Sequence, residues 1–179
     1  MTLLAETFDA LSRHGLRFTM IGAAAMAAHG VARATMDIDL LLVGRESLDS
    51  PAWDDLRRSG VSVDVRRGDA DDPLDGVVRL LRDGELPIDV VVGSAAWQRR
   101  AITRARSVDF LGIRIPVASA RDLILLKLFA GSPQDRWDIT RLLAASGDPG
   151  LPSEVESDLD ALPEGCREVW QSIAAAGRT

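Results

Sequence analysis

Hydrophobic residues change their spacing along the chain, and this change predicts the order of its elements. In the first 118 residues, short runs rich in Val, Ile and Leu predict strands, at 17–21, 36–43, 61–66, 77–82, 86–92, 107–110 and 113–115. Helices are predicted before and between these strands from helical spacing or composition, at 3–14, 23–28, 46–59 and 95–104. The remainder predicts helices only, at 119–130, 134–145, 153–160 and 163–176. We therefore expect an α+β fold, with a mixed β-sheet, flanking helices and a helical C-terminal third.

This change of pattern also predicts the domain organisation. Residues 1–118 are expected to form a core that contains the sheet, and residues 119–179 a helical part packed on that core. Within the core, Asp83-Gly84 lies between two strand-like runs, which is a strong hairpin signal.

Two aspartates interrupt the apolar run at 36–43. Asp37 and Asp39 are two residues apart, so in a strand their side chains project from the same face. Adjacent carboxylates repel each other, and burying either one unpaired is costly. A divalent cation removes this cost, and Mg²⁺ suits hard oxygen ligands on a rigid strand. The alternative interpretation is a solvated strand end or turn in an acidic protein.

A third aspartate lies in the apolar run at 86–92. Asp89 alone fits a solvated position on an edge strand, where Pro87 is also tolerated. Together with Asp37 and Asp39 it suggests a phosphoryl-transfer site, because two-metal sites use carboxylates from neighbouring strands. A carboxylate in such a site can also accept the proton of an attacking hydroxyl. Gly22, between a strand and a helix, would let phosphate approach the helix N-terminus.

Composition limits the kinds of partner and the cellular compartment that we expect for this chain. The 179 residues include 46% apolar and 27% charged residues, which is enough for one core and a charged surface. The net charge of −6 provides no overall basic field, so a nucleic-acid partner would need a local patch. The single Cys166 excludes a disulfide within the chain and a cysteine zinc cluster. With no signal peptide and no apolar run that could span a bilayer, the sequence predicts a cytoplasmic protein without membrane contact.

The ordered set of motifs resembles the DNA polymerase beta-like nucleotidyltransferase superfamily. It is most similar to the minimal bacterial subgroup that includes abortive-infection and toxin–antitoxin toxins. The superfamily pattern is a glycine-led turn and helix, then Asp-hydrophobic-Asp on the next strand, then a later strand aspartate. The subgroup pattern adds a Gly-x-x-Arg-x-Thr-x-Asp motif and an apolar helix with one lysine before Asp-x-x-Asp. The matching residues are Gly22, Gly30, Arg33, Thr35, Asp37, Ile38, Asp39, Asp89, Leu126, Lys127, Leu128, Ala130, Asp135 and Asp138.

The resemblance covers about residues 15–145 and implies a nucleotidyltransferase-like sheet and a metal site. It implies that Asp37 and Asp39 ligate Mg²⁺, with two ions in the site, and that Asp89 completes the site and is a candidate base. Asp135 and Asp138 are expected instead to cap or pair within the two helices that carry them.

The resemblance also implies a set of contacts to a nucleoside triphosphate. The turn at Gly22-Ala23 would face the triphosphate, and Arg33 and Lys127 are candidate phosphate contacts. Thr35 would steady its turn or contact the nucleotide. Each residue also has an ordinary interpretation: Arg33 as a loop cation, Thr35 as a strand former, and Lys127 as a side chain that reaches past leucines to water.

The activity that the resemblance implies is Mg²⁺-dependent transfer of a nucleoside monophosphate from NTP to a hydroxyl acceptor. The acceptor could be a tRNA, a protein or a small molecule, and a toxin role would require an antitoxin partner. The alternative is a catalytically inactive nucleotide- or partner-binding protein on the same fold. That alternative rests on the turn, because the superfamily usually has Gly-Gly or Gly-Ser where this chain has Gly22-Ala23.

Overall fold

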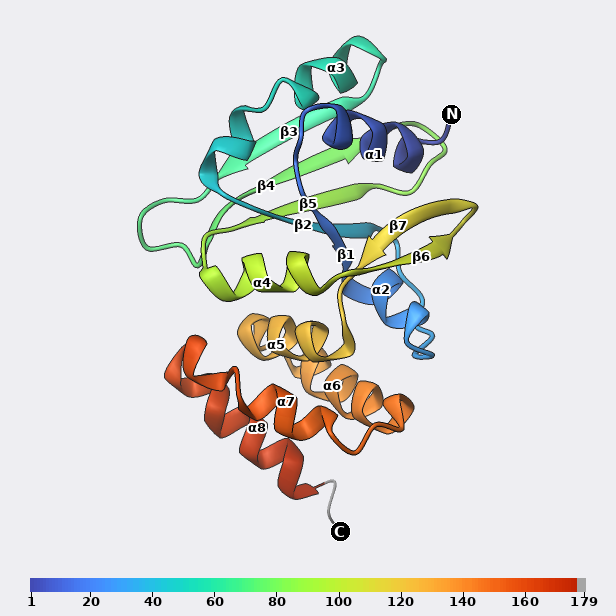
Figure 1. Ribbon diagram of the computed structural model, residues 1–179. Helices are drawn as coiled ribbons and strands as arrows, with labels where there is room; N and C mark the ends of the chain where they lie inside the picture. Colours follow the sequence, from blue (N-terminus) through green and yellow to red (C-terminus); the bar gives the residue numbers. More distant parts are fainter. Residues whose placement is uncertain (177–179) are drawn as a thin grey trace.

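The computed structural model describes residues 1–176, and its centre is one seven-stranded mixed sheet (Figure 1). The strand order is β3-β4-β5-β2-β1-β7-β6. β2 pairs with β5, and β1 with β7, in parallel, whereas all other neighbours are antiparallel. The strands are β1 Thr19–Ile21, β2 Ile38–Val43, β3 Ser62–Arg67, β4 Leu74–Leu81, β5 Ile88–Gly93, β6 Arg106–Phe110 and β7 Ile113–Val117. The predicted mixed sheet is confirmed.

Helices lie on both faces of the sheet and form the whole C-terminal part (Figure 1). α1 and α3 lie on one side of the sheet, and α2, α4 and α5 on the other, with α6, α7 and α8 stacked beyond α5. The helices are α1 Leu3–Arg13, α2 Gly22–Ala28, α3 Ala52–Arg58, α4 Ala96–Arg104, α5 Ala120–Ala130, α6 Pro133–Ser146, α7 Leu151–Glu156 and α8 Glu164–Ala176. Short 3₁₀ helices occupy Arg45–Asp49 and Leu159–Ala161. The α+β class with a helical C-terminal third is confirmed.

Local signals explain where the site-bearing helices begin and end. Ser119 caps α5, its hydroxyl accepting a hydrogen bond from the backbone N–H of Asp122, which satisfies a donor that the first turn leaves free. Ser132 and Asp135 form a reciprocal capping box at the start of α6. Gly131 ends α5 in the left-handed conformation, with φ 70°. The break between the two helices is therefore encoded locally.

One strand boundary differs from the prediction and places Asp37 outside the regular ladder. β2 begins at Ile38, whose N–H donates to the carbonyl oxygen of Pro87 at 2.9 Å. Pairing with β5 starts at Ile38 and Ile88, because Pro87 has no N–H with which to continue the ladder. Asp37 therefore lies at the entrance of β2, and Asp39 within it.

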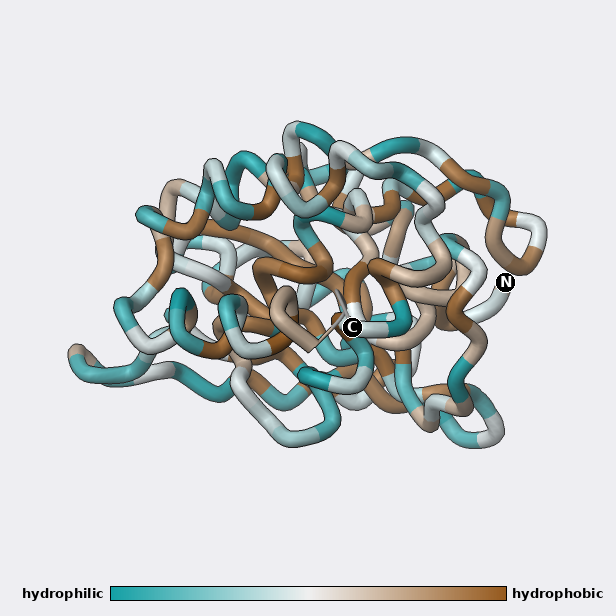
Figure 2. Tube along the Cα trace, turned by 90° about the horizontal axis from the view of Figure 1, so that it is seen from below, coloured by the Kyte–Doolittle hydropathy of each residue, from teal (hydrophilic) through white to brown (hydrophobic). Residues whose placement is uncertain are grey.

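A single hydrophobic cluster joins the sheet to the helical part. Figure 2 shows hydrophobic residues concentrated along the inner segments and hydrophilic residues mainly toward the rim. The cluster includes Leu40 and Val90 from the sheet, Trp53 from α3, Leu125 from α5 and Trp170 from α8. Both predicted parts contribute to this one cluster, so the division into domains 1–118 and 119–179 stays a prediction. The last three residues of the second part, 177–179, lie outside the described range. Within the described range, no helix has the length and apolar character needed to cross a bilayer.

Candidate active site

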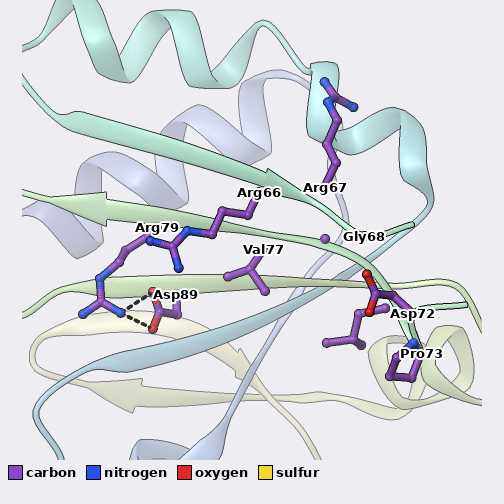
Figure 3. Close-up of a pocket in the computed structure, with 10 residues that line it drawn as sticks. Arg66, Arg67, Gly68, Asp72, Pro73, Val77, Arg79 and Asp89 are labelled. Atoms are coloured by element: carbon purple, nitrogen blue, oxygen red, sulfur yellow. Dashed lines mark hydrogen bonds and ion pairs between the residues drawn. The ribbon is translucent and has the colours of Figure 1, made fainter. Parts of the chain in front are cut away.

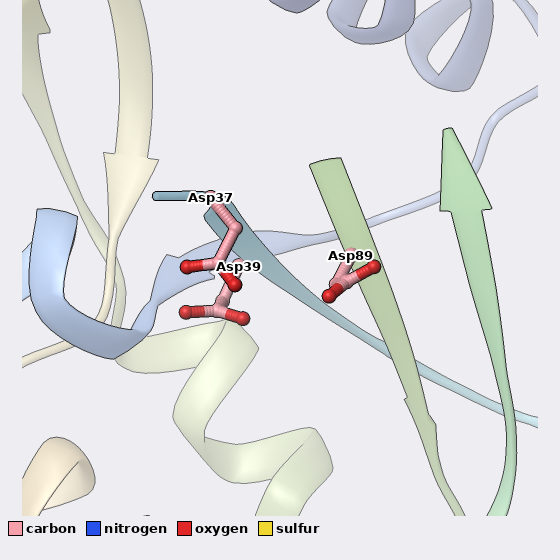
Figure 4. Close-up of side chains that lie close together, drawn as sticks. All are labelled: Asp37, Asp39 and Asp89. Carbon is pink, nitrogen blue, oxygen red and sulfur yellow. The ribbon is translucent and has the colours of Figure 1, made fainter. Parts of the chain in front are cut away.

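Three carboxylates converge at the centre of the sheet. Asp39 on β2 pairs in register with Asp89 on the parallel neighbour β5, so both project from the same face. Asp37, at the entrance of β2, completes the group, and one carboxylate oxygen from each residue lies within 4.8 Å of the others. Figure 4 shows the Asp37 and Asp39 carboxylates close together, with Asp89 facing them from β5. The structure thus brings together the three aspartates that the sequence predicts as metal ligands.

Gly22 makes room for Asp39. Gly22 is the first residue of α2 and has φ +66°, a conformation that L side chains rarely adopt. A Cβ atom at Gly22 would overlap Oδ2 of Asp39 and lie 2.7 Å from its Cγ. Position 22 therefore has to be glycine because the Asp39 carboxylate fills the space of a side chain there. The sequence alone did not indicate this reason. Ala23 beside it is only 4% exposed, so its methyl group lies within the protein.

Burial and repulsion by the neighbouring carboxylates disfavour the ionised form of Asp39. Burial, and then the charges of Asp37 and Asp89, raise the pKa of Asp39 to about 6, against the opposing influence of Lys127 and Arg33. Carboxylates that share one partly buried site disfavour each other's ionised form in this way. Bound divalent cations would reverse the effect, because they favour the ionised form of every ligand.

Arg79 is the main counter-charge of Asp89 and was missed by sequence reasoning. Its Nη1 lies 3.0 Å from Oδ2 and 3.3 Å from Oδ1 of Asp89 (Figure 3). Burial raises the pKa of Asp89, and Arg79 partly opposes that rise. A signal was available, because Arg79 and Asp89 each lie five residues from Gly84. A hairpin centred on that glycine pairs them directly.

Arg33 and Lys127, the two predicted phosphate contacts, meet at one buried aspartate. Oδ2 of Asp138 lies 2.8 Å from Nη1 of Arg33 and 2.7 Å from Nζ of Lys127. Nζ of Lys127 also donates to Asp135 at 2.8 Å. Asp138 itself is fully buried, so its charge depends on these partners. The expectation that Asp135 and Asp138 pair within the helices is confirmed, and the pairing extends to Arg33 in the loop before β2.

Thr35 supports the turn that leads into β2. Its hydroxyl contacts the carbonyl oxygen of Asp37 at 3.0 Å and Oδ1 of the same residue at 2.8 Å. Because a hydroxyl donates one proton, these two acceptors share it. Thr35 therefore fixes the Asp37 carboxylate relative to its backbone, which is the steadying role that the resemblance implies.

Two pockets flank the aspartates. One, of about 460 Å³, lies along β3 and β4 and reaches Asp89; its lining includes Arg66, Arg67 and Arg79 (Figure 3). The other, of about 330 Å³, reaches Gly22 and Lys127 and lies against α4 and α5. Both are also lined by Pro73 and Leu74. The carboxylates thus stand between an arginine-rich pocket and a largely apolar one.

A family model that describes nucleotidyl transferase AbiEii toxins of Type IV toxin–antitoxin systems matches residues 3–165. The chain belongs to the AbiEii family. The match covers the sheet, the three aspartates and α5 to α7, so it includes every site residue described above. As a member of the AbiEii family, the protein is a nucleotidyltransferase, and the predicted superfamily and abortive-infection subgroup are confirmed.

Solved structures confirm the fold of this AbiEii protein. The solution structure of the antibiotic-resistance factor ANT(2'')-Ia is 18% identical, over 98% of this chain and 93% of that chain, with a TM-score of 0.55. A crystal structure of ANT(2")-Ia in complex with adenylyl-2"-tobramycin is 17% identical, over 97% and 96%, with a TM-score of 0.51. A candidate nucleotidyltransferase from Thermotoga maritima is 18% identical, over 79% and 91%, with a TM-score of 0.52. No curated protein sequence matches the chain.

Proposed function

We propose that this AbiEii protein uses Mg²⁺ to transfer a nucleoside monophosphate from NTP to a hydroxyl on a polyanionic acceptor such as tRNA. The observation that carries the proposal is the convergence of Asp37, Asp39 and Asp89 within 4.8 Å on one face of the sheet. A toxin role with an antitoxin partner forms part of the proposal and follows from the family.

The carboxylates suit Mg²⁺ in chemistry and in charge. They supply only oxygen ligands, which Mg²⁺ prefers, and a bound cation would offset the burial and mutual repulsion that raise the pKa of Asp39. Asp37 and Asp39 would hold two ions together with Asp89. When bound, the ions neutralise charge on the phosphates and favour an in-line displacement.

The nucleotide is assigned to the side of the carboxylates where Gly22 and Lys127 line the smaller pocket. The backbone at Gly22-Ala23 and the cations Arg33 and Lys127 would contact the triphosphate. Ala23 is buried and does not line the smaller pocket, so its methyl group does not occupy the space proposed for the triphosphate.

The transfer itself exchanges one phosphorus–oxygen bond for another. The acceptor oxygen forms a bond to the α-phosphorus, the bond from that phosphorus to the bridging oxygen of the β-phosphate breaks, and pyrophosphate leaves. The proton of the acceptor hydroxyl passes to Asp89, which lies at the boundary with the arginine-rich pocket.

The arginine-rich pocket favours a negatively charged acceptor. Arg66, Arg67 and Arg79 line it, against the carboxylates of Asp72 and Asp89. Figure 3 shows Arg66 reaching toward Asp89 on the same face of the sheet. Guanidinium groups match phosphate oxygens in geometry and charge, whereas they repel polycations such as aminoglycosides. In a protein with a net charge of −6, these arginines are the local patch that we propose for a nucleic-acid acceptor, whose phosphates would compete with the aspartates paired with them, Asp64, Asp49 and Asp89.

The test is transfer of α-labelled NTP to total tRNA, to lysate protein and to an aminoglycoside, with Mg²⁺ and with EDTA. We expect label on tRNA that disappears with EDTA and in Asp39→Asn and Asp89→Asn. Asp109→Asn, an exposed carboxylate on β6, is the control and should keep full transfer. Tight Mg²⁺–NTP binding without transfer to any acceptor would favour the inactive binding protein instead.

A further inference from the structure

The smaller pocket beside Gly22 is lined mainly by apolar side chains. Its volume is about 330 Å³, within the range typical of ligand sites. Apart from Gly22, Lys127, Gln98 and Asp135, its lining is apolar, with Val91 from the sheet and Leu123, Leu126 and Phe129 from α5. Phe129 is held in place by an edge-on contact with Trp97, at 5.4 Å between ring centroids.

One polar group in this lining is buried without a partner. Gln98, in the first turn of α4, is only 1% exposed, and its Nε2 makes no hydrogen bond to any residue in the described part of the chain. An unpaired buried donor costs free energy, and native proteins contain few of them. A buried amide at the wall of a pocket therefore requires an explanation.

The orientation of this amide is fixed by its other end. Oε1 of Gln98 accepts a hydrogen bond from the backbone N–H of Ala95 at 2.9 Å, so the amide cannot flip without losing it. Gly93 leaves the space that the amide occupies, because a Cβ atom there would lie 2.6 Å from Cδ of Gln98. The two N–H groups on Nε2 are thus fixed in orientation, and neither has an acceptor among the described residues.

We infer that the smaller pocket is the nucleobase subsite and that Gln98 donates a hydrogen bond to the base; this rests on the proposed nucleotide site. The triphosphate end of the pocket is defined by Gly22 and Lys127, and the apolar lining beyond them suits the faces of a base. Because Oε1 already accepts from Ala95 and its orientation is fixed by that bond, Gln98 is poorly placed for the bidentate pair that glutamine makes with adenine. Its donors instead suit the exocyclic carbonyl of guanine, cytosine or uracil.

The test compares ligands that differ only in the base. Calorimetry with Mg²⁺ would measure binding of α,β-methylene analogues of the four NTPs and of inorganic tripolyphosphate, which contacts the phosphate side alone. We expect Gln98→Met to weaken the guanine, cytosine and uracil analogues about fivefold to tenfold. The adenine analogue should lose less, and tripolyphosphate nothing. The wild-type protein should also bind ribose 5-triphosphate, which lacks a base, more weakly than it binds the NTP analogues.

The matched control is Thr7→Val. Thr7 in α1 carries another buried polar atom without a partner in the described residues, but it lines neither pocket beside the aspartates. Its removal should leave all five affinities unchanged. Equal losses for tripolyphosphate and the NTP analogues in Gln98→Met, or no loss for any ligand, would overturn the base subsite while the proposed function stands. Failure of the wild-type protein to bind either NTP analogues or tripolyphosphate would overturn both.

Discussion

The carboxylate of Asp39 occupies the space in which any side chain on Gly22 would begin. The contact joins the start of α2 to the centre of β2, and it makes the glycine part of the proposed metal site. We expect Gly22→Ala to displace Asp39 and to abolish both Mg²⁺-dependent thermal stabilisation and nucleotidyl transfer. Thermal unfolding with and without Mg²⁺ measures the first effect directly.

Gly30→Ala is the control that distinguishes displacement of Asp39 from the effect of backbone strain alone. Gly30 also has a positive φ, +79°, but a Cβ atom there would meet nothing within 4 Å. Both alanine variants carry the conformational cost of a positive φ, which is about 1–2 kcal/mol. Only Gly22→Ala should lose the response to Mg²⁺. An equal loss in Gly30→Ala would show that strain, rather than the contact with Asp39, explains the effect.

Asp39 should make the stability of the metal-free protein depend on pH. Its pKa is about 6 in the folded state, above the ordinary aspartate value of 3.8, so the folded protein keeps a proton that the unfolded chain loses. The free energy of unfolding should therefore fall as the pH rises from about 4 to 6, by on the order of 2–3 kcal/mol. Asp39→Asn should recover this stability above pH 6 and show little gain near pH 4. Urea unfolding in EDTA measures the difference, and a gain that is the same at every pH would contradict it.

Asp138 should contribute both to stability and to nucleotide binding, because it is buried and holds Arg33 and Lys127. Removing one partner of a buried ion pair costs about 3–5 kcal/mol, so Asp138→Asn should lower the free energy of unfolding by roughly that amount. Binding of tripolyphosphate should also weaken. Asp160→Asn is the control, since Asp160 pairs with Arg167 at the exposed surface, where such pairs contribute about 0–1 kcal/mol. Similar losses in both variants would contradict a special role for Asp138.

Arg66 should act on the acceptor and leave the nucleotide unaffected. It lines the arginine-rich pocket, reaches toward Asp89 and is not part of the lining of the pocket at Gly22. Arg66→Ala is expected to raise the KM for a tRNA acceptor several-fold and to reduce its dependence on salt, with NTP binding unchanged. Arg114→Ala, an exposed arginine on β7, is the matched control. A change in NTP affinity, or an equal effect of both variants, would contradict the assignment.

Much of the fold follows from local patterns that the sequence contains. Apolar runs and helical spacing predict the strands and helices in their observed order. Asp83-Gly84 predicts the hairpin of β4 and β5, and the capping serines Ser119 and Ser132 fix where α5 and α6 begin. These features depend on backbone geometry and on neighbours within a few residues, which is why they can be predicted without tertiary contacts.

The gathering of the three aspartates was predicted by resemblance and by strand alternation together. Alternation places Asp39 and Asp89 on the half-buried faces of their strands, between fully buried neighbours, but it does not determine which strands are neighbours. The parallel pairing of β2 with β5 provides that information and sets the two carboxylates in register. The exact start of β2 also depended on this pairing, because Pro87, just before β5, ends the ladder at Ile38.

By itself, the sequence determined the kind of chemistry: which residues carry charge, which segments are strands, and which ordered motif relates the chain to nucleotidyltransferases. Only the tertiary structure decided how those residues act on one another. It placed Asp39 against Gly22, gave Asp89 the counter-charge of Arg79, joined Arg33 and Lys127 at Asp138, and left the amide of Gln98 without a partner. Each of these relationships depends on burial and distance between segments far apart in the chain, and both quantities arise only when the sheet and the helices pack together.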